Sequence, residues 1–472
     1  MLLSALWSVL LPACTDAAKP DGPPADSGTQ SNDTDPVADT DSAEDTEPPA
    51  PAALELGGFT PRNVIVINAD TLRADTLPQW GSVRDPLAEL RAGTNWASVA
   101  RTVSTAPWTA PSTASLLTGE PAEVHGVRFY DQTGPNYPLA VPDFASYLQG
   151  LGVATALLTG SNVVTNPAWS LTQGFDYVER VDDEPGNAAA LVLNAEAWLD
   201  TLEPEQPFLL FLQPMDMHGP YRAEDADSWT YAEPEDAFFD LEGGQAAQYA
   251  EIEAALVGVE DAERSVILAT LRKIYDEQAL GLGRAVSALV DDLERRGLDD
   301  DTLLVFTSDH GETFDDGDVE YLAHSGFPRH EVVTIPLMFG GPAVPEATAP
   351  CLASNMDVFP TIVQAMGLPP MGFTTGASLL DGCRDHAFSA LYTSDGGVQT
   401  LHAVSVESLE AQVVFDCADG RKRAFDLVED PTAVRVVSLA DAPGGEELGE
   451  ALTAHLAEIL AMFPDLTCTV AD

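Results

Sequence analysis

The chain has 472 residues, of which 45% are hydrophobic and 21% charged, so it can bury a sizeable core and is not a wholly disordered protein. Asp and Glu number 76 against 21 Lys and Arg, which gives a formal net charge of −55. A surface with that charge repels the phosphate backbone, and we therefore expect no nucleic-acid partner.

The first segment is typical of an export signal. An apolar run from Leu2 to Leu11 is too short to span a bilayer as a mature helix, and Pro12, Ala13 and Cys14 follow it directly. The order Leu-Pro-Ala-Cys resembles the lipobox of bacterial lipoproteins, in which the cysteine carries the lipid, although no Lys or Arg precedes the run. We predict a signal peptide over residues 1–14, a lipid on Cys14 and an extracytoplasmic location in a bacterial cell envelope. Ordinary secretion is the alternative.

A disordered acidic tether is predicted over residues 15–57. Its composition of Asp, Thr, Pro, Ala and Ser offers almost nothing to bury, which cannot offset the entropy of ordering the chain. Since no later stretch approaches the length of an apolar membrane span, we expect contact with a membrane through the lipid anchor only.

Strand and helix patterns alternate after residue 60. Five apolar runs are typical of buried parallel strands: Asn63–Ile67, Val153–Thr159, Phe208–Leu212, Leu303–Thr307 and Ile335–Phe339. Three helical patterns lie between them: Phe144–Leu151, Ala188–Leu202 and Asp261–Arg296. This alternation predicts α/β/α layers around a largely parallel sheet.

The pattern changes after about Ala390. Short strands are predicted at Ala411–Phe415 and Val434–Leu439, and a final helix at Glu446–Met462. We therefore divide the globular part into a main domain over residues 58–390 and a small α+β subdomain over residues 391–472.

Four cysteines remain besides Cys14, namely Cys351, Cys383, Cys417 and Cys468. An even count in an exported protein predicts two disulfides, and proximity in sequence favours Cys351–Cys383 with Cys417–Cys468 among the three possible pairings. No spacing of Cys and His indicates a zinc site.

Polar residues follow two of the predicted strands. Asp70 comes after the first strand, and Asp309 and His310 come after the fourth. Two carboxylates and an imidazole at one sheet edge would make a divalent metal site, whereas a lone Asp after a strand is often a helix cap. A hydroxyl-rich segment, Ser104–Gly119, runs from a turn into a predicted helix, where an exposed nucleophile can be held. A simple capped helix start is the alternative for that segment.

Together these segments resemble the sulfatase family of the alkaline phosphatase superfamily. The matching segments, in order, are Asn63–Asp75, Thr109–Gly119, Phe208–Tyr221, Thr307–Glu312 and His324, and the resemblance extends over about residues 62–440. It implies a three-layer α/β/α alkaline-phosphatase-like sandwich with a small C-terminal α+β subdomain.

The resemblance also implies roles for single residues. It assigns one divalent cation to four side chains, namely Asp70, Thr109, Asp309 and His310. Thr109 stands at the position of the nucleophile, His218 at that of the group that protonates the departing oxygen, and His324 at that of a residue that binds the esterified anion. The family suggests Ca²⁺, while an imidazole ligand suits Mn²⁺ or Zn²⁺ better by softness.

The chain departs from the family pattern at four positions. Thr71 follows Asp70 where many members have a second acid, and Thr109 replaces the Cys or Ser that is converted to formylglycine. Thr113 stands in place of the signature Arg, and Glu120 in place of a frequent Lys or Arg, so two cationic groups that would bind an anionic ester are absent. The hydrated formylglycine has a second hydroxyl that expels sulfate by elimination, which Thr109 lacks, and this favours phosphate over sulfate esters.

Three further residues have local interpretations. His125 precedes Gly126 as in the family's His-Gly pair, but a turn histidine that bonds nearby backbone is an equally good interpretation. Asp216 is interpreted as a turn former and not a second-metal ligand, and His330 as a surface residue.

The sequence therefore predicts a metal-dependent hydrolase of sulfate or phosphate esters, with phosphoesters favoured and a small-molecule, glycan or lipid ester as substrate. Two alternatives stay open. One is a cell-envelope transferase that carries a phospho-head-group to another alcohol, and the other is a surface binding protein on a catalytically decayed scaffold.

Overall fold

The computed structural model describes residues 53–129, 137–181, 188–221, 230–231, 244–314, 322–324, 326–372, 374–395 and 398–468. The chain divides into two units, residues 1–48 and 49–472, and every described residue lies in the second. The predicted signal, Cys14 and the tether up to residue 52 lie outside the described residues. Leu54 and Leu56 are both buried in the core, so ordered chain begins before residue 58.

The main sheet has nine strands. Eight of them follow the order β11 (Ala347–Ser354), β2 (Trp96–Val103), β10 (Leu337–Gly340), β6 (Thr302–Thr307), β1 (Asn63–Asn68), β5 (Phe208–Gln213), β3 (Ala154–Thr159) and β4 (Tyr177–Arg180), and β9 (Thr334–Ile335) pairs with β2. From β6 to β4 all neighbours are parallel. The three central strands β1, β5 and β6 are buried along their whole length and mostly apolar, because both faces of the sheet are covered there.

The predicted strand Ile335–Phe339 is wrong in its direction and continuity. Pro336, which has no backbone N–H to donate, separates β9 from β10. β10 runs antiparallel to both β6 and β2, with Phe339 opposite Val305. An apolar run indicates that a strand is buried but not in which direction it runs, so the sequence pattern could not distinguish a parallel from an antiparallel strand.

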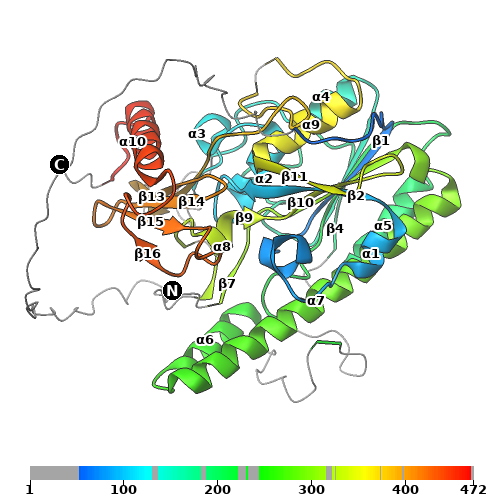
Figure 1. Ribbon diagram of the computed structural model, residues 1–472. Helices are drawn as coiled ribbons and strands as arrows, with labels where there is room; N and C mark the ends of the chain where they lie inside the picture. The colour runs from blue at the N-terminus through cyan, green and yellow to red at the C-terminus, as the bar shows by residue number, and fades with distance from the viewer. Residues whose placement is uncertain are drawn as a thin grey trace, which may run out of the picture. The chain divides into compact units, whose positions relative to one another are not determined.

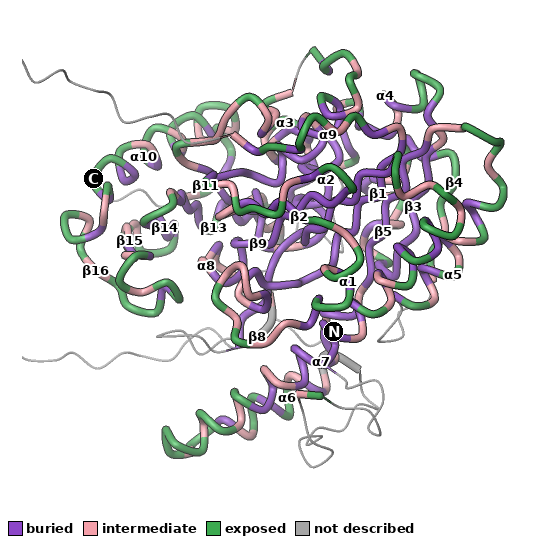
Figure 2. Tube along the Cα trace, turned by 45° about the vertical axis from the view of Figure 1, so that its right-hand side comes forward, coloured by how far each residue is buried: buried purple, intermediate pink, exposed green. Residues whose placement is uncertain are grey.

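Helices cover both faces of the sheet (Figures 1 and 2). Ile65 and Ile67 of β1 share a core with α1 (Ala88–Gly93), α5 (Ala188–Leu199) and α7 (Asp261–Arg296). Val64 and Val66 point the other way, into a core with α2 (Thr109–Thr118), α4 (Phe144–Gly150) and α9 (Val358–Ala365). The three-layer α/β/α architecture predicted from the sequence is therefore confirmed.

A second sheet forms the C-terminal part, and its core also includes Ala122 and Phe129 of the main domain. It is antiparallel, in the order β12 (Ala387–Asp395), β13 (Val398–Glu407), β14 (Ala411–Asp416), β15 (Arg421–Asp426) and β16 (Val436–Val437), and α10 (Gly445–Met462) packs on it. The backbone N–H of Ala390 in β12 donates to the carbonyl of Thr105, which is 2.9 Å away. This bond joins β12 to the segment that leads into α2.

Shorter elements complete the described chain: α3 (Ala122–His125), α6 (Gly244–Leu256), α8 (His330–Val333), the paired strands β7 (Thr313–Phe314) and β8 (Leu322–Ala323), and several 3₁₀ turns. Cys351 is bonded to Cys383 and Cys417 to Cys468, as the sequence favoured. Within the described ranges, every helix is too short or too polar to cross a membrane.

Candidate active site

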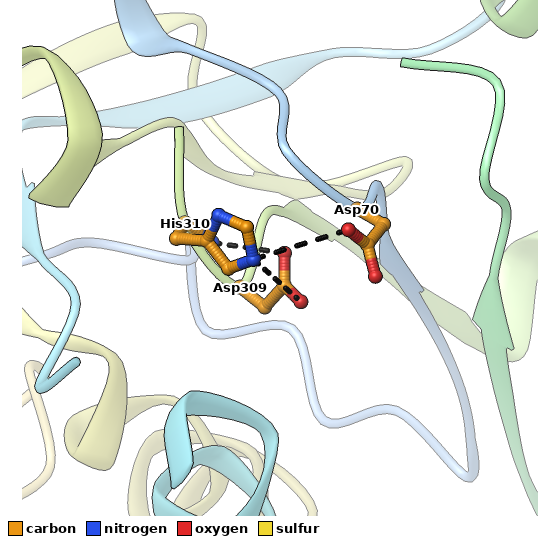
Figure 3. Close-up of side chains that lie close together, drawn as sticks. All are labelled: Asp70, Asp309 and His310. Atoms are coloured by element: carbon orange, nitrogen blue, oxygen red, sulfur yellow. Dashed lines mark hydrogen bonds and ion pairs between the residues drawn. The ribbon is translucent and has the colours of Figure 1, made fainter. Parts of the chain in front are cut away.

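Three buried ligand groups meet at the carboxyl edge of the parallel strands. Asn68 and Thr307 are register partners at the ends of β1 and β6, and Asp70 and Asp309 each follow two residues later, so their side chains arrive at the same level. The possible ligand atoms of Asp70, Asp309 and His310 all lie within 4.8 Å of one another. Figure 3 shows the three side chains facing one another. Nε2 of His310 lies 3.6 Å from Asp309 and 3.9 Å from Asp70.

Backbone contacts fix the orientation of these groups. Oδ1 of Asp309 accepts from the backbone N–H of His310 at 2.9 Å and of Thr71 at 3.2 Å. Thr71 has a left-handed φ of 62°, and its carbonyl accepts from the Tyr275 hydroxyl at 2.6 Å. Nδ1 of His310 donates to the carbonyl of Gly311 at 2.9 Å, which leaves the lone pair of Nε2 facing the carboxylates.

The residues present fit a divalent cation. Burial, together with the neighbouring Asp309 carboxylate, raises the pKa of Asp70 to about 6, and burial raises the pKa of Asp309 to about 6. Burial also lowers the pKa of His310 to about 4, which keeps the imidazole neutral. Oδ1 of Asp70 is buried and has no hydrogen-bond partner in the protein. A bound cation would compensate for the buried negative charge, and the described chain offers no second cluster of this kind.

The first residue of α2, Thr109, places its hydroxyl beside this cluster. Oγ1 of Thr109 is 3.3 Å from Nε2 of His310, and the side chain is buried. Ser112, one turn into the helix, donates to the Asp309 carbonyl, and its own Oγ accepts from Nδ2 of Asn355 at 3.0 Å. These bonds fasten the start of α2 to the end of β6, so the Thr109 hydroxyl is held in position.

Two further histidines lie next to the cluster. The ring of His324 is 4.6 Å from that of His310 and 5.0 Å from that of His218, measured between centroids. Nδ1 of His218 donates to the carbonyl of Gly219 at 2.8 Å, and burial lowers its pKa. His324 lies 3.3 Å from the fully buried Glu312; burial lowers the pKa of His324, but the Glu312 carboxylate raises it, and the result is above the ordinary value.

A cavity of about 610 Å³ opens onto Thr109, His218 and His324. The other residues that line it are mainly aromatic, aliphatic or amide side chains: Trp108, Asn162, Val163, Asn166, Trp169, Leu391, Tyr392 and Thr393. None of the described lining residues is Lys or Arg. The last three come from β12, so the C-terminal sheet forms one wall of the cavity.

Thr113 and Glu120, two of the residues that depart from the family pattern, are both buried. Thr113 is fully buried within α2, and its hydroxyl has no hydrogen-bond partner. Glu120 is buried as well, and it accepts from the backbone N–H of Thr375 at 3.1 Å. Among the described histidines near the cluster, His324 is the one whose pKa is raised, so it carries a positive charge more readily than a free imidazole.

The remaining residues singled out in the sequence do not join the cluster. His125 is buried, and its Nδ1 accepts from the backbone N–H of Val127 at 3.1 Å, which is a local backbone role. Asp216 accepts from the backbone N–H of Ala188, the first residue of α5, at 3.0 Å. The interpretation of His330 as a plain surface residue is wrong, because its side chain is only 11% exposed and lies 3.2 Å from the buried Glu407.

Sequence reasoning missed two residues that contact the site. Gln213, the last residue of β5, donates from Nε2 to Oδ2 of Asp70 at 3.0 Å and to Oδ2 of Asp309 at 3.4 Å. Glu312 contacts Nδ1 of His324 at 3.3 Å. A signal for Gln213 was present, because a polar residue that ends an apolar strand next to β1 must reach the same sheet edge as Asp70.

The fold and the cluster define a three-layer α/β/α protein with a metal-type site at the carboxyl edge of its parallel strands. The sequence profile described as Sulfatase matches residues 62–368, and the chain belongs to the sulfatase family. The matched region begins at residue 62, where the resemblance predicted from the motifs also begins, and it ends before the C-terminal sheet.

Two characterised relatives show partial similarity. The low-salt glycan biosynthesis sulfotransferase Agl7 of Haloferax volcanii is 25% identical over 318 residues, which are 65% of this chain and 61% of that protein. The choline-sulfatase of Rhizobium meliloti is 29% identical over 192 residues, which are 39% of this chain and 36% of that protein. The chain thus matches less than two thirds of the length of either relative.

Solved structures share the fold. A protein in complex with its substrate D-glucosamine-2-N,6-O-disulfate has a TM-score of 0.64 at 16% identity, over 86% of this chain and 99% of that one. The phosphonate monoester hydrolase of Agrobacterium radiobacter has a TM-score of 0.61 at 19% identity, over 85% of this chain and 95% of that one. At these identities the likeness concerns the fold.

Proposed function

We propose that the chain is a metal-dependent ester hydrolase in which Thr109 is the nucleophile and phosphate esters are preferred over sulfate esters. The observation that carries the proposal is the position of the Thr109 hydroxyl, 3.3 Å from Nε2 of His310, at the point where the buried cluster meets the cavity. A buried hydroxyl at a helix start, next to ligands for a cation, has the surroundings that a nucleophile needs.

Asp70, Asp309 and His310 would hold the cation, together with Thr109. The bound ion would lower the pKa of the hydroxyl that it contacts and neutralise charge on the transferred group. Oγ1 of Thr109 loses its proton to solvent and forms a bond to phosphorus, while the bond from phosphorus to the alcohol oxygen breaks and that oxygen takes a proton from His218. Water then attacks the phosphorylated threonine; its oxygen leaves in the phosphate, and one of its protons restores the Thr109 hydroxyl.

The two histidines have different tasks in this scheme. Because Nδ1 of His218 donates to the Gly219 carbonyl, proton exchange with the departing oxygen takes place at Nε2. Burial lowers the pKa of His218, so its protonated form is a stronger acid than a free imidazolium. His324, whose pKa is raised, binds a non-bridging oxygen of the ester with its positive charge.

The preference for phosphate follows from the chemistry of threonine. A sulfated Thr109 could be cleared only by attack of water on a poorly electrophilic, already anionic sulfate. A phosphorylated Thr109 can be cleared by metal-assisted attack in line. One relative is named a sulfotransferase, which points to sulfate chemistry in that protein. A direct comparison of phosphate and sulfate esters is therefore the decisive measurement.

The lining of the cavity supports an uncharged alcohol as leaving group. Tryptophan faces and the amides of Asn162 and Asn166 are suited to the apolar faces and hydroxyls of a sugar or a small alcohol. A polyanionic leaving group would find no Lys or Arg among the described lining residues and would meet the field of a chain with net charge −55. Such a substrate in a cell envelope agrees with the proposed lipid anchor on Cys14.

Kinetics on matched nitrophenyl phosphate and nitrophenyl sulfate test the proposal. We expect faster turnover of the phosphate, dependence on an added divalent cation, and loss of at least about 10³-fold in kcat for Thr109→Ala. Thr109→Ser is the matched control, since it keeps the hydroxyl and should keep measurable activity. A clear preference for sulfate would refute the phosphate assignment, and full activity of Thr109→Ala would refute the nucleophile.

Transfer to a second alcohol is the other candidate, and the sulfotransferase relative is the observation that favours it. A transferase should release nitrophenol slowly in water and faster when glycerol or a sugar is added, with the acceptor alcohol appearing as a new ester. Hydrolysis predicts inorganic phosphate in equal amount to nitrophenol, whatever alcohol is present.

A further inference from the structure

We infer that Gln213 is a fifth ligand of the cation, through its side-chain oxygen, beside Asp70, Asp309, His310 and Thr109. The inference rests on the metal site of the proposed function and adds to it a residue that the family resemblance does not assign. It starts from the departure at Thr71, where the sequence has no second acid and one ligand of the usual set is missing.

The backbone N–H of Thr71 donates to Asp309, its carbonyl accepts from Tyr275, and its φ lies in the left-handed region. Oγ1 of Thr71 is buried and makes no hydrogen bond, whereas the side chain of Gln213 contacts both carboxylates. Gln213 is therefore the better placed source of the missing oxygen. Gln213 is the last residue of β5, which pairs with β1 on the side opposite β6. It therefore lies at the same sheet edge as Asp70 and Asp309, at the end of a third strand.

The position of the Gln213 amide matches that of a ligand. Its terminal atom lies 3.0 Å from Oδ2 of Asp70 and 3.4 Å from Oδ2 of Asp309. Two oxygens at right angles around an ion at about 2.1 Å to about 2.4 Å are themselves about 3.0–3.4 Å apart. The side chain is fully buried, and so are the three groups drawn in Figure 3.

The orientation of the amide depends on the charge in the site. In the structure the NH₂ group faces the two carboxylates and Oε1 has no hydrogen-bond partner. Rotation of the amide by half a turn exchanges the two ends with little change in shape, and the oxygen and nitrogen are nearly equivalent sterically. Without a cation, hydrogen bonding favours the described orientation, because the reversed one would turn the amide oxygen toward the carboxylates and lose both bonds. A cation between the carboxylates repels the NH₂ end and attracts the oxygen.

The competing interpretation is that Gln213 only donates to the carboxylates and positions them. Both interpretations predict weaker cation binding when the amide is removed, because partners of ligands also affect affinity, by about 10–100-fold. The number of water molecules on the ion separates them. A lost ligand is replaced by one water, whereas a lost positioning group leaves the ion's hydration unchanged.

Eu³⁺ is a suitable probe, because it replaces hard divalent cations and its luminescence lifetimes in H₂O and D₂O count the waters bound to it. We would compare the whole chain with Gln213→Met, which has a similar length and no oxygen, and with Gln213→Glu, which restores an oxygen ligand. Gln412→Leu is the matched control, since Gln412 is a buried glutamine that donates to a carboxylate, Glu407, at 2.7 Å in the C-terminal sheet. Calorimetry with Ca²⁺ on metal-free protein gives the affinities.

We expect one additional bound water in Gln213→Met, a wild-type count in Gln213→Glu and in Gln412→Leu, and roughly 10-fold weaker Ca²⁺ binding in Gln213→Met alone. An unchanged water count in Gln213→Met, with or without weaker binding, would overturn the inference and leave the proposed function intact. If the unaltered chain bound neither Eu³⁺ nor Ca²⁺, the metal site of the proposed function would fall together with it.

Discussion

Asp70 and Asp309 are buried side by side, and this arrangement predicts how the stability of the protein changes when one of the two carboxylates is removed. We predict that Asp70→Asn stabilises the metal-free protein at pH 7, although it removes a ligand of the cation. The introduced carboxamide would keep an oxygen for the Gln213 amide, which donates to Asp70 at 3.0 Å, and would place an NH₂ group where Oδ1 now has no partner. The variant therefore loses a buried charge and leaves no established hydrogen bond unmade.

The magnitude follows from the pKa of Asp70. Burial and the Asp309 carboxylate raise that pKa from 3.8 to about 6, and one pH unit corresponds to about 1.4 kcal/mol. Keeping the carboxylate ionised at pH 7 thus costs about 3 kcal/mol, which is the upper limit of the gain expected for Asp70→Asn. Because native Asp70 keeps its proton to a higher pH than unfolded Asp70, the contribution of this residue to the stability of the metal-free protein should fall as the pH rises from about 4 to 6, and the difference between wild type and Asp70→Asn isolates it.

Urea titrations in the presence of a chelator measure the effect. Asp75→Asn is the control, because Asp75 contacts Arg73 at 2.7 Å and Arg272 at 2.8 Å, which hold its pKa well below the ordinary value. Loss of that carboxylate should destabilise the protein at pH 7, while Asp70→Asn should shift the midpoint to higher urea and abolish Ca²⁺ binding. A lower midpoint for metal-free Asp70→Asn than for metal-free wild type would refute the reasoning.

Three more predictions concern the rest of the chain. Replacing Cys351 and Cys383 by Ser should lower the free energy of unfolding by up to about 4 kcal/mol, since the bond closes a loop with a separation of 32 residues, and calorimetry under non-reducing conditions measures it. Arg384→Met should cost about 3–5 kcal/mol in a denaturation experiment, because it leaves the buried Asp357 carboxylate, now bound by two guanidinium nitrogens, without its cation. Intact-mass analysis of membrane extracts should show a lipid on Cys14, and continued membrane association of Cys14→Ser would speak against an anchor.

The parts of the fold that the sequence predicted are those with a strong local signal. The long helix predicted from about Asp261 to Arg296 agrees with α7, since its helical pattern is long and Gly297 marks its end. The central strands were found since burial on both faces leaves a continuous apolar run. β2 contains Arg101 and Thr102 amid small residues and gave no such run, so it was missed.

The site was predictable to the extent that its residues follow predicted strands or stand in recognisable motifs. Asp70, Asp309 and His310 converge as their places after β1 and β6 required. The sequence places Gln213 at the polar end of an apolar strand, but the carboxylates that it contacts depend on which strands are neighbours. The contact of Glu312 with His324 depends on where a loop returns, and local sequence gives neither. The same holds for the wall of the cavity, which comes from a strand some 280 residues after Thr109 in the chain.

That wall has a consequence for how enzymes of this architecture diverge. Leu391, Tyr392 and Thr393 line the cavity from β12, which belongs to the C-terminal sheet and follows the region that the family profile covers. If the proposed function holds, these three side chains contact the alcohol and not the cluster at the ends of β1 and β6, so relatives with the same cluster and a different β12 should differ in the alcohol that they accept. An exchange of the β12–β13 hairpin between such relatives would test this.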